Sequence, residues 1–413
     1  MKGEMNALES RPSVAPDTIA RVFQEIVYRR RVSRSDLAEL TGLTRTTIGT
    51  IVEHLLALGI VSEVGVGKSQ GGRPPIIIEI NHDSAYAVGA GMQDLHWNMV
   101  VTNLDARVIA RDEVTIEDAR PESAVRALHE GYRRLLAQVP ATAHLLPMVG
   151  VGSPGVVDVA TGVVHGAVDL GWGTVDLGVE LKNLLGVPVA VANRSRVGAL
   201  AEIWCAHLRG EVRELVYVTI GTGVAAGIVH NGVLVPGATS SAGELGHVVV
   251  APDGPVCGCG NRGCLQTLVN ERAILNRANV LARAAGIAGF GDAREVVAAA
   301  DIPHPVGATG TEALRDPRLS AARRTIDEAG RYLATALGTV INLLNPEQLV
   351  LGGPMIDAGP ALLEATRRHL PDHAMSYPLA AATVRGSSFG RDSSAIGAAV
   401  MVIQRAPELL FQA

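Results

Sequence analysis

Three of the chain's four cysteines lie within eight residues, and this cluster restricts the local fold more than any other segment. Cys257, Cys259 and Cys264 carry the thiols, and His247 lies ten residues before the first of them. Three thiolates and one imidazole make a complete tetrahedral ligand set for a structural zinc ion. Disulfide bonding would leave one of the three thiols unpaired. The sequence therefore predicts a loop folded around zinc, with no coordination position left open for metal catalysis.

The composition indicates a globular protein with more than one domain. A chain of 413 residues that is 47% hydrophobic and contains 46 glycines can bury two or three cores. The first residues lack the apolar run of a secretory signal, and no stretch approaches the about 18 apolar residues of a membrane span. Thiolate ligands need a reducing compartment, so we expect the protein in the cytoplasm. Cys205, the remaining cysteine, is expected to be a small buried side chain.

The first eighty residues have the helical pattern of a DNA-binding domain, although the net charge of −5 gives no global reason to expect one. Apolar spacing predicts a helix over residues 16–30, and Ser33 is placed to cap a short helix over 35–41. Gly42 makes a turn, and Thr44 caps a third helix with a polar exposed face. This order is that of a helix-turn-helix, whose second helix enters the major groove.

Two apolar strands, over residues 60–64 and 76–80, enclose a glycine-rich basic loop and complete a winged helix-turn-helix domain over residues 1–80. The arginine cluster, the first turns of the third helix and the basic loop supply the residues that we expect to contact DNA. These are Arg34, Arg45, Thr46, Thr47, Thr50, Lys68 and Arg73. The alternative is a small helical bundle with solvated arginines. Binding of this kind relies on phosphate contacts and weakens steeply with salt.

From about residue 85 the chain alternates strands with Ala- and Leu-rich helices, which predicts an α/β fold with helix-covered sheets. We expect a two-stranded hairpin over residues 86–111 and helices over 124–138 and 322–344. We also expect a strand and turn over 148–158, a strand running into a helix over 187–205, a pair of strands over 215–235 and a strand over 348–351. Glycine-rich turns at 221–223 and 352–353 are candidate phosphate turns. Each turn alone is weak evidence.

The segments SAGELGHVVV and CGCGNRGCL, with GSPGVVD at 152–158 and the stretch 170–189, resemble the signature of the ROK family of sugar kinases and sugar-responsive repressors. The resemblance covers residues 85–405. It implies the actin-like ATPase fold of sugar kinases, with two α/β lobes and a cleft between them. The winged head matches the family's repressor branch, which includes xylose- and N-acetylglucosamine-responsive bacterial repressors.

Two positions depart from the family's kinases. The resemblance places the catalytic aspartate directly after Asn193, where this chain has Arg194, and a guanidinium cannot accept a proton at neutral pH. The first phosphate loop should read approximately Asp-x-Gly-Gly-Thr, but the aligned stretch is GMQDL, with Gly91 at the aspartate position and Asp94 at a glycine position. The sequence therefore predicts no catalytic residues.

On the sugar side the resemblance implies an effector site. Its expected residues are Ser153, Gly155, Asn193, Arg194, Glu244, His247 and Gln266. Zinc would hold one imidazole nitrogen of His247 and leave the other for the ligand. Because a guanidinium binds phosphate or carboxylate well, Arg194 favours a phosphorylated or acidic sugar over a neutral hexose. The alternative is that Arg194 pairs with a nearby acid such as Glu202 or Glu244.

Three hypotheses follow. The first is a sugar-responsive transcriptional regulator, a repressor by resemblance, that binds double-stranded operator DNA as a homodimer or homotetramer and so lies on the nucleoid. Its effector would be a sugar or sugar phosphate, and its one cofactor would be a structural zinc ion. The second is an active ROK sugar kinase with a DNA-binding head, which needs a base other than Arg194. The third is a ligand-independent DNA-binding protein whose body is a dimerisation scaffold.

Overall fold

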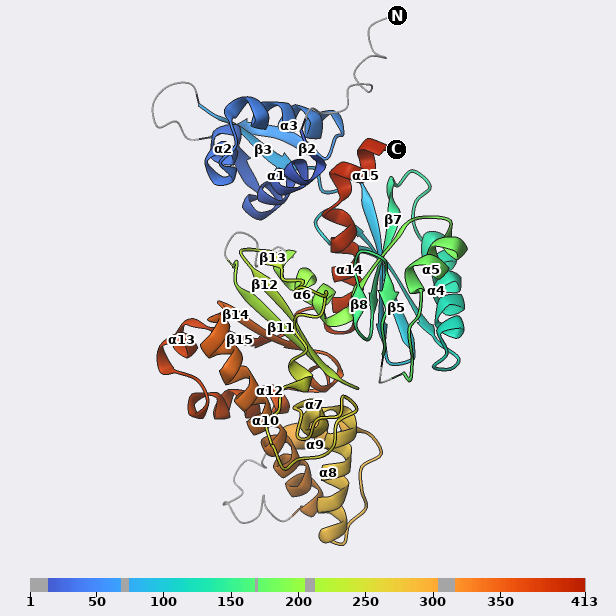
Figure 1. Cartoon of the computed structure of the whole chain (residues 1–413), viewed down its shortest axis with the longest axis vertical. Coiled ribbons are helices and arrows are strands. Elements are labelled where there is room, and N and C mark those ends of the chain that lie inside the picture. Colours follow the sequence, from blue (N-terminus) through green and yellow to red (C-terminus); the bar gives the residue numbers. More distant parts are fainter. Residues whose placement is uncertain (1–13, 68–73, 168–169, 205–211, 304–315, 413) are drawn as a thin grey trace, which may run out of the picture.

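The computed structural model describes residues 14–67, 74–167, 170–204, 212–303 and 316–412 (Figure 1). The expectations for Lys68, Arg73 and Cys205 lie outside the described residues. Figure 1 shows a small head at one end of the molecule and two α/β lobes below it. No helix in the described ranges is long and apolar enough to cross a membrane.

The head combines three helices with a three-stranded sheet in the order β1-β3-β2. Its elements are α1 (Pro16–Arg29), β1 (Arg31–Ser33), α2 (Arg34–Thr41), α3 (Arg45–Ala57), β2 (Val61–Val66) and β3 (Ile76–Ile80). The predicted caps are confirmed: Ser33 and Asp36 form a reciprocal capping box at α2, and Thr44 Oγ1 accepts the amide of Thr47 at 3.1 Å. The expected winged helix-turn-helix architecture is therefore present.

The first lobe is built on a five-stranded sheet in the order β10-β7-β4-β5-β6. Its strands are β4 (Tyr86–Gln93), β5 (His96–Asn103), β6 (Val108–Thr115), β7 (Leu145–Ser153) and β10 (Val189–Asn193). The first three are antiparallel in chain order, whereas β7 and β10 run parallel to β4. The predicted single hairpin over 86–111 was wrong, because Ala106 (φ 57°) makes a second tight turn and starts a third strand.

The second lobe repeats this plan in the order β13-β12-β11-β14-β15. Its strands are β11 (Leu215–Ile220), β12 (Val224–His230), β13 (Val233–Leu234), β14 (Gln348–Gly352) and β15 (Thr383–Gly386). Here too three antiparallel strands are followed by two parallel ones. Two sheets with one strand order and one pattern of directions form the expected two-lobed actin-like fold.

Helices cover the outer faces of both sheets. In the first lobe these are α4 (Pro121–Leu136) and α5 (Leu177–Leu185), with the short strands β8 (Val157–Asp158) and β9 (Val163–Val164) nearby. The second lobe carries α7 (Gln266–Val269), α8 (Glu271–Ala284), α9 (Ala293–Asp301), α10 (Pro317–Leu344), α11 (Pro354–Asp357), α12 (Ala361–His369) and α13 (Ser376–Ala381). Its 3-10 turns are η1 (Leu245–His247), η2 (Leu370–Asp372) and η3 (Gly390–Asp392).

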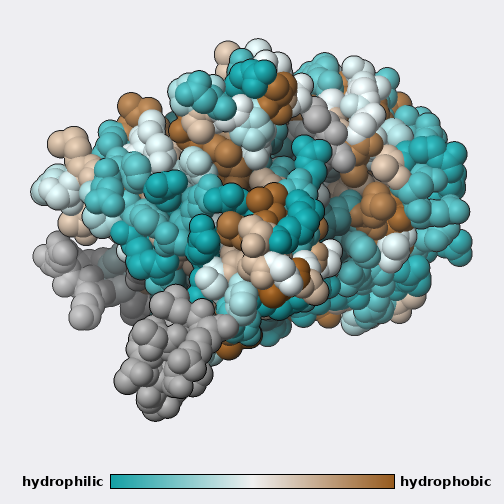
Figure 2. Space-filling model, turned by 90° about the horizontal axis from the view of Figure 1, so that it is seen from below, coloured by the Kyte–Doolittle hydropathy of each residue, from teal (hydrophilic) through white to brown (hydrophobic). Residues whose placement is uncertain are grey.

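The long helix α10 begins five residues before the predicted position 322, because Asp316 caps it at Pro317. Helix α4 likewise begins at Pro121, three residues before the predicted start. Seen from below, the helical end of the second lobe is mostly hydrophilic, with small separate hydrophobic patches (Figure 2). These helices therefore turn their apolar faces towards their own sheet.

Two helices lie between the sheets, α6 (Arg194–Trp204) and α14 (Ser393–Ile403). Helix α14 returns from the second lobe and packs on β4 and β7. A Cβ added at Gly89 or Gly150 would lie 2.1 or 1.9 Å from a backbone oxygen of α14, so these strand glycines are what allow the helix to lie so close. The glycine-rich strands read from the sequence thus have a packing role.

The head is joined to the first lobe by a continuous hydrophobic core. Apolar residues of the head, of β5 and of α14 form one buried cluster, which also takes in Ala406 and Leu409 of α15 (Ala406–Gln412). Helix α1 packs against α15, whereas α3 packs on α1, α2 and β2 and lies on the side of the head away from both lobes (Figure 1). Within the described residues, no element of either lobe therefore covers α3, the second helix of the helix-turn-helix.

Candidate functional site

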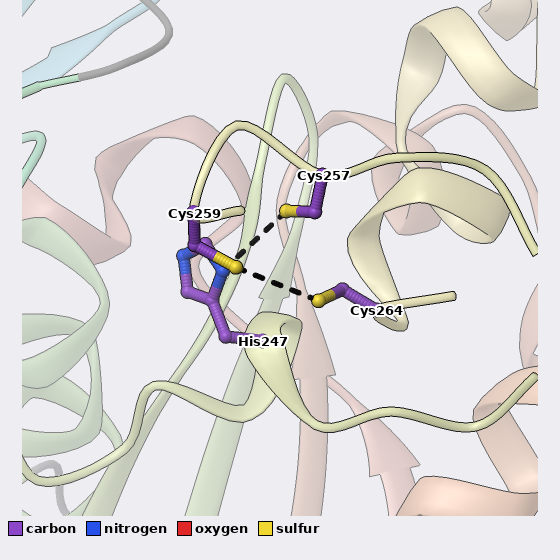
Figure 3. A group of neighbouring side chains, drawn as sticks. All are labelled: His247, Cys257, Cys259 and Cys264. Atoms are coloured by element: carbon purple, nitrogen blue, oxygen red, sulfur yellow. Dashed lines mark hydrogen bonds between the residues drawn. The ribbon is translucent and has the colours of Figure 1, made fainter. Parts of the chain in front are cut away.

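The four predicted metal ligands come together in the second lobe (Figure 3). His247 ends η1, and the three cysteines lie in the loop that leads into α7. The ligand atoms all lie within 4.8 Å of one another, with Cys257 Sγ 3.6 Å from His247 Nδ1 and Cys259 Sγ 3.7 Å from Cys264 Sγ. Ligands placed about 2.1–2.3 Å from a tetrahedral zinc are roughly 3.5–3.8 Å apart. The cluster therefore fits a metal ion of zinc size.

The loop around this cluster requires Gly263. A Cβ at this residue would lie 1.5 Å from the carbonyl oxygen of Ala251, and its φ of 67° is in the left-handed region. The amides of Val250 and Ala251 both donate to the carbonyl of Gly263, which fixes the loop against the segment that follows η1. The ligand spacing is thus set by backbone bonds as well as by the thiols.

His247 presents its two ring nitrogens to different partners. Nδ1 faces Cys257, whereas Nε2 lies 4.0 Å from Glu244 Oε2. Burial raises the pKa of Glu244, and the nearby charges of His247 and Arg196 counteract that rise. A metal at the thiol side would fix the imidazole and leave Nε2 facing the pocket beside Glu244.

A pocket of about 610 Å³ lies between the lobes next to this pair. This volume is in the range of roughly 300–1,000 Å³ that is typical of small-molecule sites. Six of the seven expected effector residues line it, namely Gly155, Asn193, Arg194, Glu244, His247 and Gln266. They come from both lobes, so a ligand here would touch both.

Ser153, the seventh expected residue, is not among the residues that line this pocket. It ends β7 with its side chain fully buried, and its Oγ donates to the carbonyl of Pro154 at 3.1 Å. Ser153 is therefore buried, whereas Gly155, two residues later, faces the pocket. Ser153 therefore lies next to the pocket but is not part of its lining.

Two amide side chains hold the pocket's framework. Asn193 Nδ2 donates to the carbonyl of Gly155 at 2.8 Å, and its Oδ1 accepts the amide of Ser195. Gln266 Nε2 donates to Cys257 Sγ at 3.3 Å, which connects the pocket directly to the thiol cluster. Both residues therefore position their neighbours as well as face the pocket.

Sequence reasoning missed a group of pocket residues in the second lobe. Thr219, Thr222, Asn270 and Glu271 also line the pocket. Asn270 caps α8 and donates from Nδ2 to the carbonyl of Thr222 at 3.0 Å. The sequence indicates the Gly-Thr-Gly turn only as a candidate phosphate turn. The helix cap at Asn270 is the signal that could have placed α8 beside this turn.

Arg194 begins α6 and reaches across the cleft. Its Nη2 donates to Thr222 Oγ1 at 3.1 Å, and its Nη1 lies 3.5 Å from the carbonyl oxygen of Met92. The suggested pairing partner Glu202 instead binds Arg385 at 2.8 Å and accepts Ser387 Oγ at 2.7 Å. Glu202 thus has partners of its own, and pairing of Arg194 with a nearby acid stays a prediction.

A second, much smaller space lies on the far side of Arg194, lined by the turns at Gly221 and Gly353. It holds about 30 Å³, whereas one water needs roughly 10–15 Å³ measured in the same way. Gly91, aligned with the first phosphate-loop aspartate, has no room for a side chain, because its Cβ would lie 2.6 Å from that of Ser394. Asp94 pairs with Arg294 of α9 at 3.1 Å, across the lobes.

The head presents part of its expected DNA face to solvent. Arg45, Thr46 and Thr50 are exposed on α3, and Thr47 is half-buried. Arg34 is placed differently, because it lies 2.5 Å from Glu53 and 3.1 Å from Glu63. The guanidinium bridges Glu53 of α3 and Glu63 of β2, and so holds the helix against the strand.

Known proteins resemble the chain along most of its length. The sequence profile of the ROK family matches residues 86–405. A putative xylose repressor of Caldicellulosiruptor sp. (strain Rt8B.4) is 28% identical over 92% of this chain and 94% of its own length. A glucokinase of Halalkalibacterium halodurans is 32% identical over 62% of this chain and 76% of its own.

The fold has a solved counterpart that includes the head. The crystal structure of a ROK family transcriptional regulator, a homologue of the E. coli MLC protein, covers 96% of this chain and 99% of its own with a TM-score of 0.75 and 25% identity. The family profile covers well over half of the chain, and the site geometry agrees with the residues that suggested the resemblance. The chain therefore belongs to the ROK family.

Proposed function

We propose that this protein is a sugar-responsive transcriptional repressor. The observation that carries the proposal is the combination of two parts: a winged helix-turn-helix head whose helix α3 faces away from the lobes, and a two-lobed body with a ligand-sized pocket in its cleft. The similarity to a putative xylose repressor extends over both parts. A regulator of this kind acts in the cytoplasm, on the nucleoid when bound to DNA.

The effector is a sugar or sugar phosphate held between the lobes. Glu244 and His247 offer a carboxylate and an imidazole nitrogen to hydroxyl groups from the second lobe, and Asn193 and Gly155 lie opposite on the first. A ligand that touches both lobes favours one lobe arrangement over another, and can only shift that equilibrium by its differential affinity. Because the head shares a core with the first lobe, such a shift would reach the DNA contacts.

The metal in the thiol cluster is structural zinc. His247, Cys257, Cys259 and Cys264 would hold it, and their spacing suits tetrahedral coordination. Bound zinc would supply rigidity to the loop and fix the tautomer of His247. Four protein ligands leave no position for a reacting group.

An active sugar kinase is the second candidate, favoured by the 32% identity to a glucokinase. Phosphoryl transfer needs a base near the sugar hydroxyl and a path from the nucleotide to the sugar. At the base position Arg194 instead bonds Thr222 across that path, and Gly91 has no room for a carboxylate. These two observations favour the regulator.

DNA binding titrated with ligand tests the proposal. DNA duplexes would be selected from a random pool with the wild-type protein, and the selected duplex titrated in the presence of matched neutral sugars and sugar phosphates. We expect one class of sugar to change the duplex affinity at least tenfold. Selection without any enriched sequence would overturn the DNA-binding proposal. Enrichment with no response to any sugar would favour the ligand-independent scaffold.

The oligomer is the remaining part of the proposal. A dimer or tetramer would place two heads on a palindromic site, with half-sites about one helical turn or a multiple of it apart. Sedimentation velocity of the free protein, together with the spacing in the selected duplexes, tests this. A monomer bound to single half-sites would contradict it.

A further inference from the structure

In the residues that the structure describes, the α-helices use glycine for close packing, with one exception. Six glycines in α-helices have a neighbour within 3.1 Å of the position that a Cβ would take: Gly131, Gly178, Gly198, Gly330, Gly338 and Gly397. Gly49 of α3 is also inside a helix, yet a Cβ built there meets no atom within 4 Å. Within the described part of the chain, Gly49 is the one glycine in an α-helix whose lack of a side chain is not explained by a close neighbour.

Glycine at such a position has a cost. In a helix interior it is about 1 kcal/mol less favourable than alanine. The neighbouring exposed residues Thr46 and Thr50 are also weak helix formers, each roughly 0.5–0.7 kcal/mol below alanine. These positions make no contribution to the head's core, which lies on the opposite face with Ile48, Ile51 and Leu55. The exposed face of α3 is therefore not selected for the stability of the helix.

The position of Gly49 indicates which kind of binding partner could pack against it. Helical spacing places it on the same exposed arc as Thr46 and Thr50, one turn from Arg45. α3 lies on the side of the head away from the lobes (Figure 1). Glu53, the acid on this arc, lies 2.5 Å from Arg34, which it shares with Glu63, so its charge is partly offset. A surface with a guanidinium, hydroxyls and a bare stretch of backbone suits a duplex groove.

We propose that Gly49 is the point at which the backbone of α3 lies directly against DNA, so that the absence of a side chain sets the depth of the helix in the major groove. This inference rests on the proposed DNA-binding function. The close approach brings Arg45, Thr46 and Thr50 within reach of base edges, which carry the sequence information that phosphate contacts lack. Gly49 is then a specificity-determining residue that makes no side-chain contact.

The test is Gly49→Ala in the full-length protein, with the duplex selected by the wild-type protein as probe. The methyl group has room in the free protein and improves helix propensity, so we expect a melting temperature equal to or above that of wild type. We expect affinity for the selected duplex to fall at least tenfold, with affinity for random-sequence DNA unchanged within twofold. Retention of selected-duplex affinity within twofold overturns the proposal.

Ala57→Gly is the matched control, because it makes the reverse change on the same exposed arc two turns further along the helix. It lowers helix propensity, and we expect it to leave duplex affinity unchanged within twofold. An equal loss in both variants would show that any change of side-chain size on this arc lowers affinity, and would overturn the assignment of the groove contact to Gly49. A change of oligomeric state in Gly49→Ala without DNA would place a second copy of the chain at Gly49 instead. If wild type selects no sequence, the proposed function fails before the variant is made.

Discussion

Arg194 of the first lobe donates to Thr222 of the second, with 3.1 Å between Nη2 and Oγ1. Both residues line the ligand-sized pocket and the small space beside Gly353, so the bond lies between the two. The position that the resemblance assigns to the catalytic base of a kinase is here occupied by an arginine that connects the two lobes. An anionic group on a ligand would compete for the same guanidinium, since charged pairs are stronger than neutral hydrogen bonds.

We therefore predict that the pocket prefers a phosphorylated or acidic sugar, and that Arg194→Gln removes the preference. Calorimetry with matched neutral and 6-phosphorylated sugars should give at least tenfold tighter binding of the charged ligand to wild type. In the variant the two ligands should differ by less than threefold. Equal or tighter binding of the neutral sugars by wild type would sink the prediction.

Removal of the metal should affect the pocket more than the head. We expect one zinc per chain by elemental analysis. Chelation, or Cys264→Ser, should lower the melting temperature by several degrees, because metal binding is coupled to the fold of the loop. Sugar affinity should fall at least tenfold, since His247 and Gln266 both bond the cluster.

The selected-duplex affinity of the metal-free protein serves as the control, because the head lies at the other end of the molecule. It should stay within threefold of wild type in the absence of sugar. Unchanged melting and sugar binding after complete metal removal would contradict a structural role.

The head also has an ionic contact with the second lobe. Glu25 of α1 lies 3.6 Å from Arg213, whose carbonyl accepts the amide of Gly232 in the second lobe. Glu25 Oε2 is buried and makes no hydrogen bond. The cost of burying its charge is therefore offset by two cations, Arg213 at 3.6 Å and Arg29 at 3.9 Å. We predict that Arg213→Ala costs about 0–1 kcal/mol of stability, as for other partly exposed pairs.

The larger effect of Arg213→Ala should be on regulation. The ratio of duplex affinities with and without the effective sugar should fall at least threefold, because the head loses its tie to the moving lobe. Arg29→Ala is the matched control: it removes the other cation near Glu25 but lies on the same helix. An equal loss of regulation in both variants would argue that only the charge of Glu25 matters.

Glu271 gives a prediction about pH. Burial raises its pKa above the ordinary value of 4.5, and Asp94 adds to the rise while Arg294 opposes it. A carboxyl with a raised pKa in the folded state favours folding when protonated, so its contribution is lost as pH rises from about 4.5 through the folded pKa. Glu271→Gln should therefore melt at the same or a higher temperature than wild type at pH 7, and lose less stability between pH 5 and pH 7. A lower melting temperature at pH 7 would count against it.

Local sequence rules predicted the head well. The caps at Ser33 and Thr44 and the turn at Gly42 lie within a few residues of the groups that they bond, so spacing alone locates them. The cysteine loop was predicted for the same reason, as its thiols are close in sequence as well as in space. Helix starts were less certain where a proline begins the helix before its apolar repeat, as at Pro121 and Pro317.

What the sequence did not show depends on contacts between distant residues. The charge of Arg34 is visible in the sequence and predicts a DNA contact, whereas its pairing with Glu53 and Glu63 depends on the packing of α3 on β2. Ser153 was assigned to the pocket by its motif, and only the direction of β7 turns it inward. The partner of Glu202 lies 183 residues away in Arg385, beyond any local rule.

The contact between α1 and α15 has a consequence for how the protein is made. α1 emerges early from the ribosome, whereas Ala406 and Leu409, which complete the shared apolar cluster, follow every other described element in the chain. A head on a chain without α15 would expose the apolar side chains of α1 that α15 contacts. The head can therefore reach its docked form only after both lobes, which lie between α1 and α15 in the sequence, have been made.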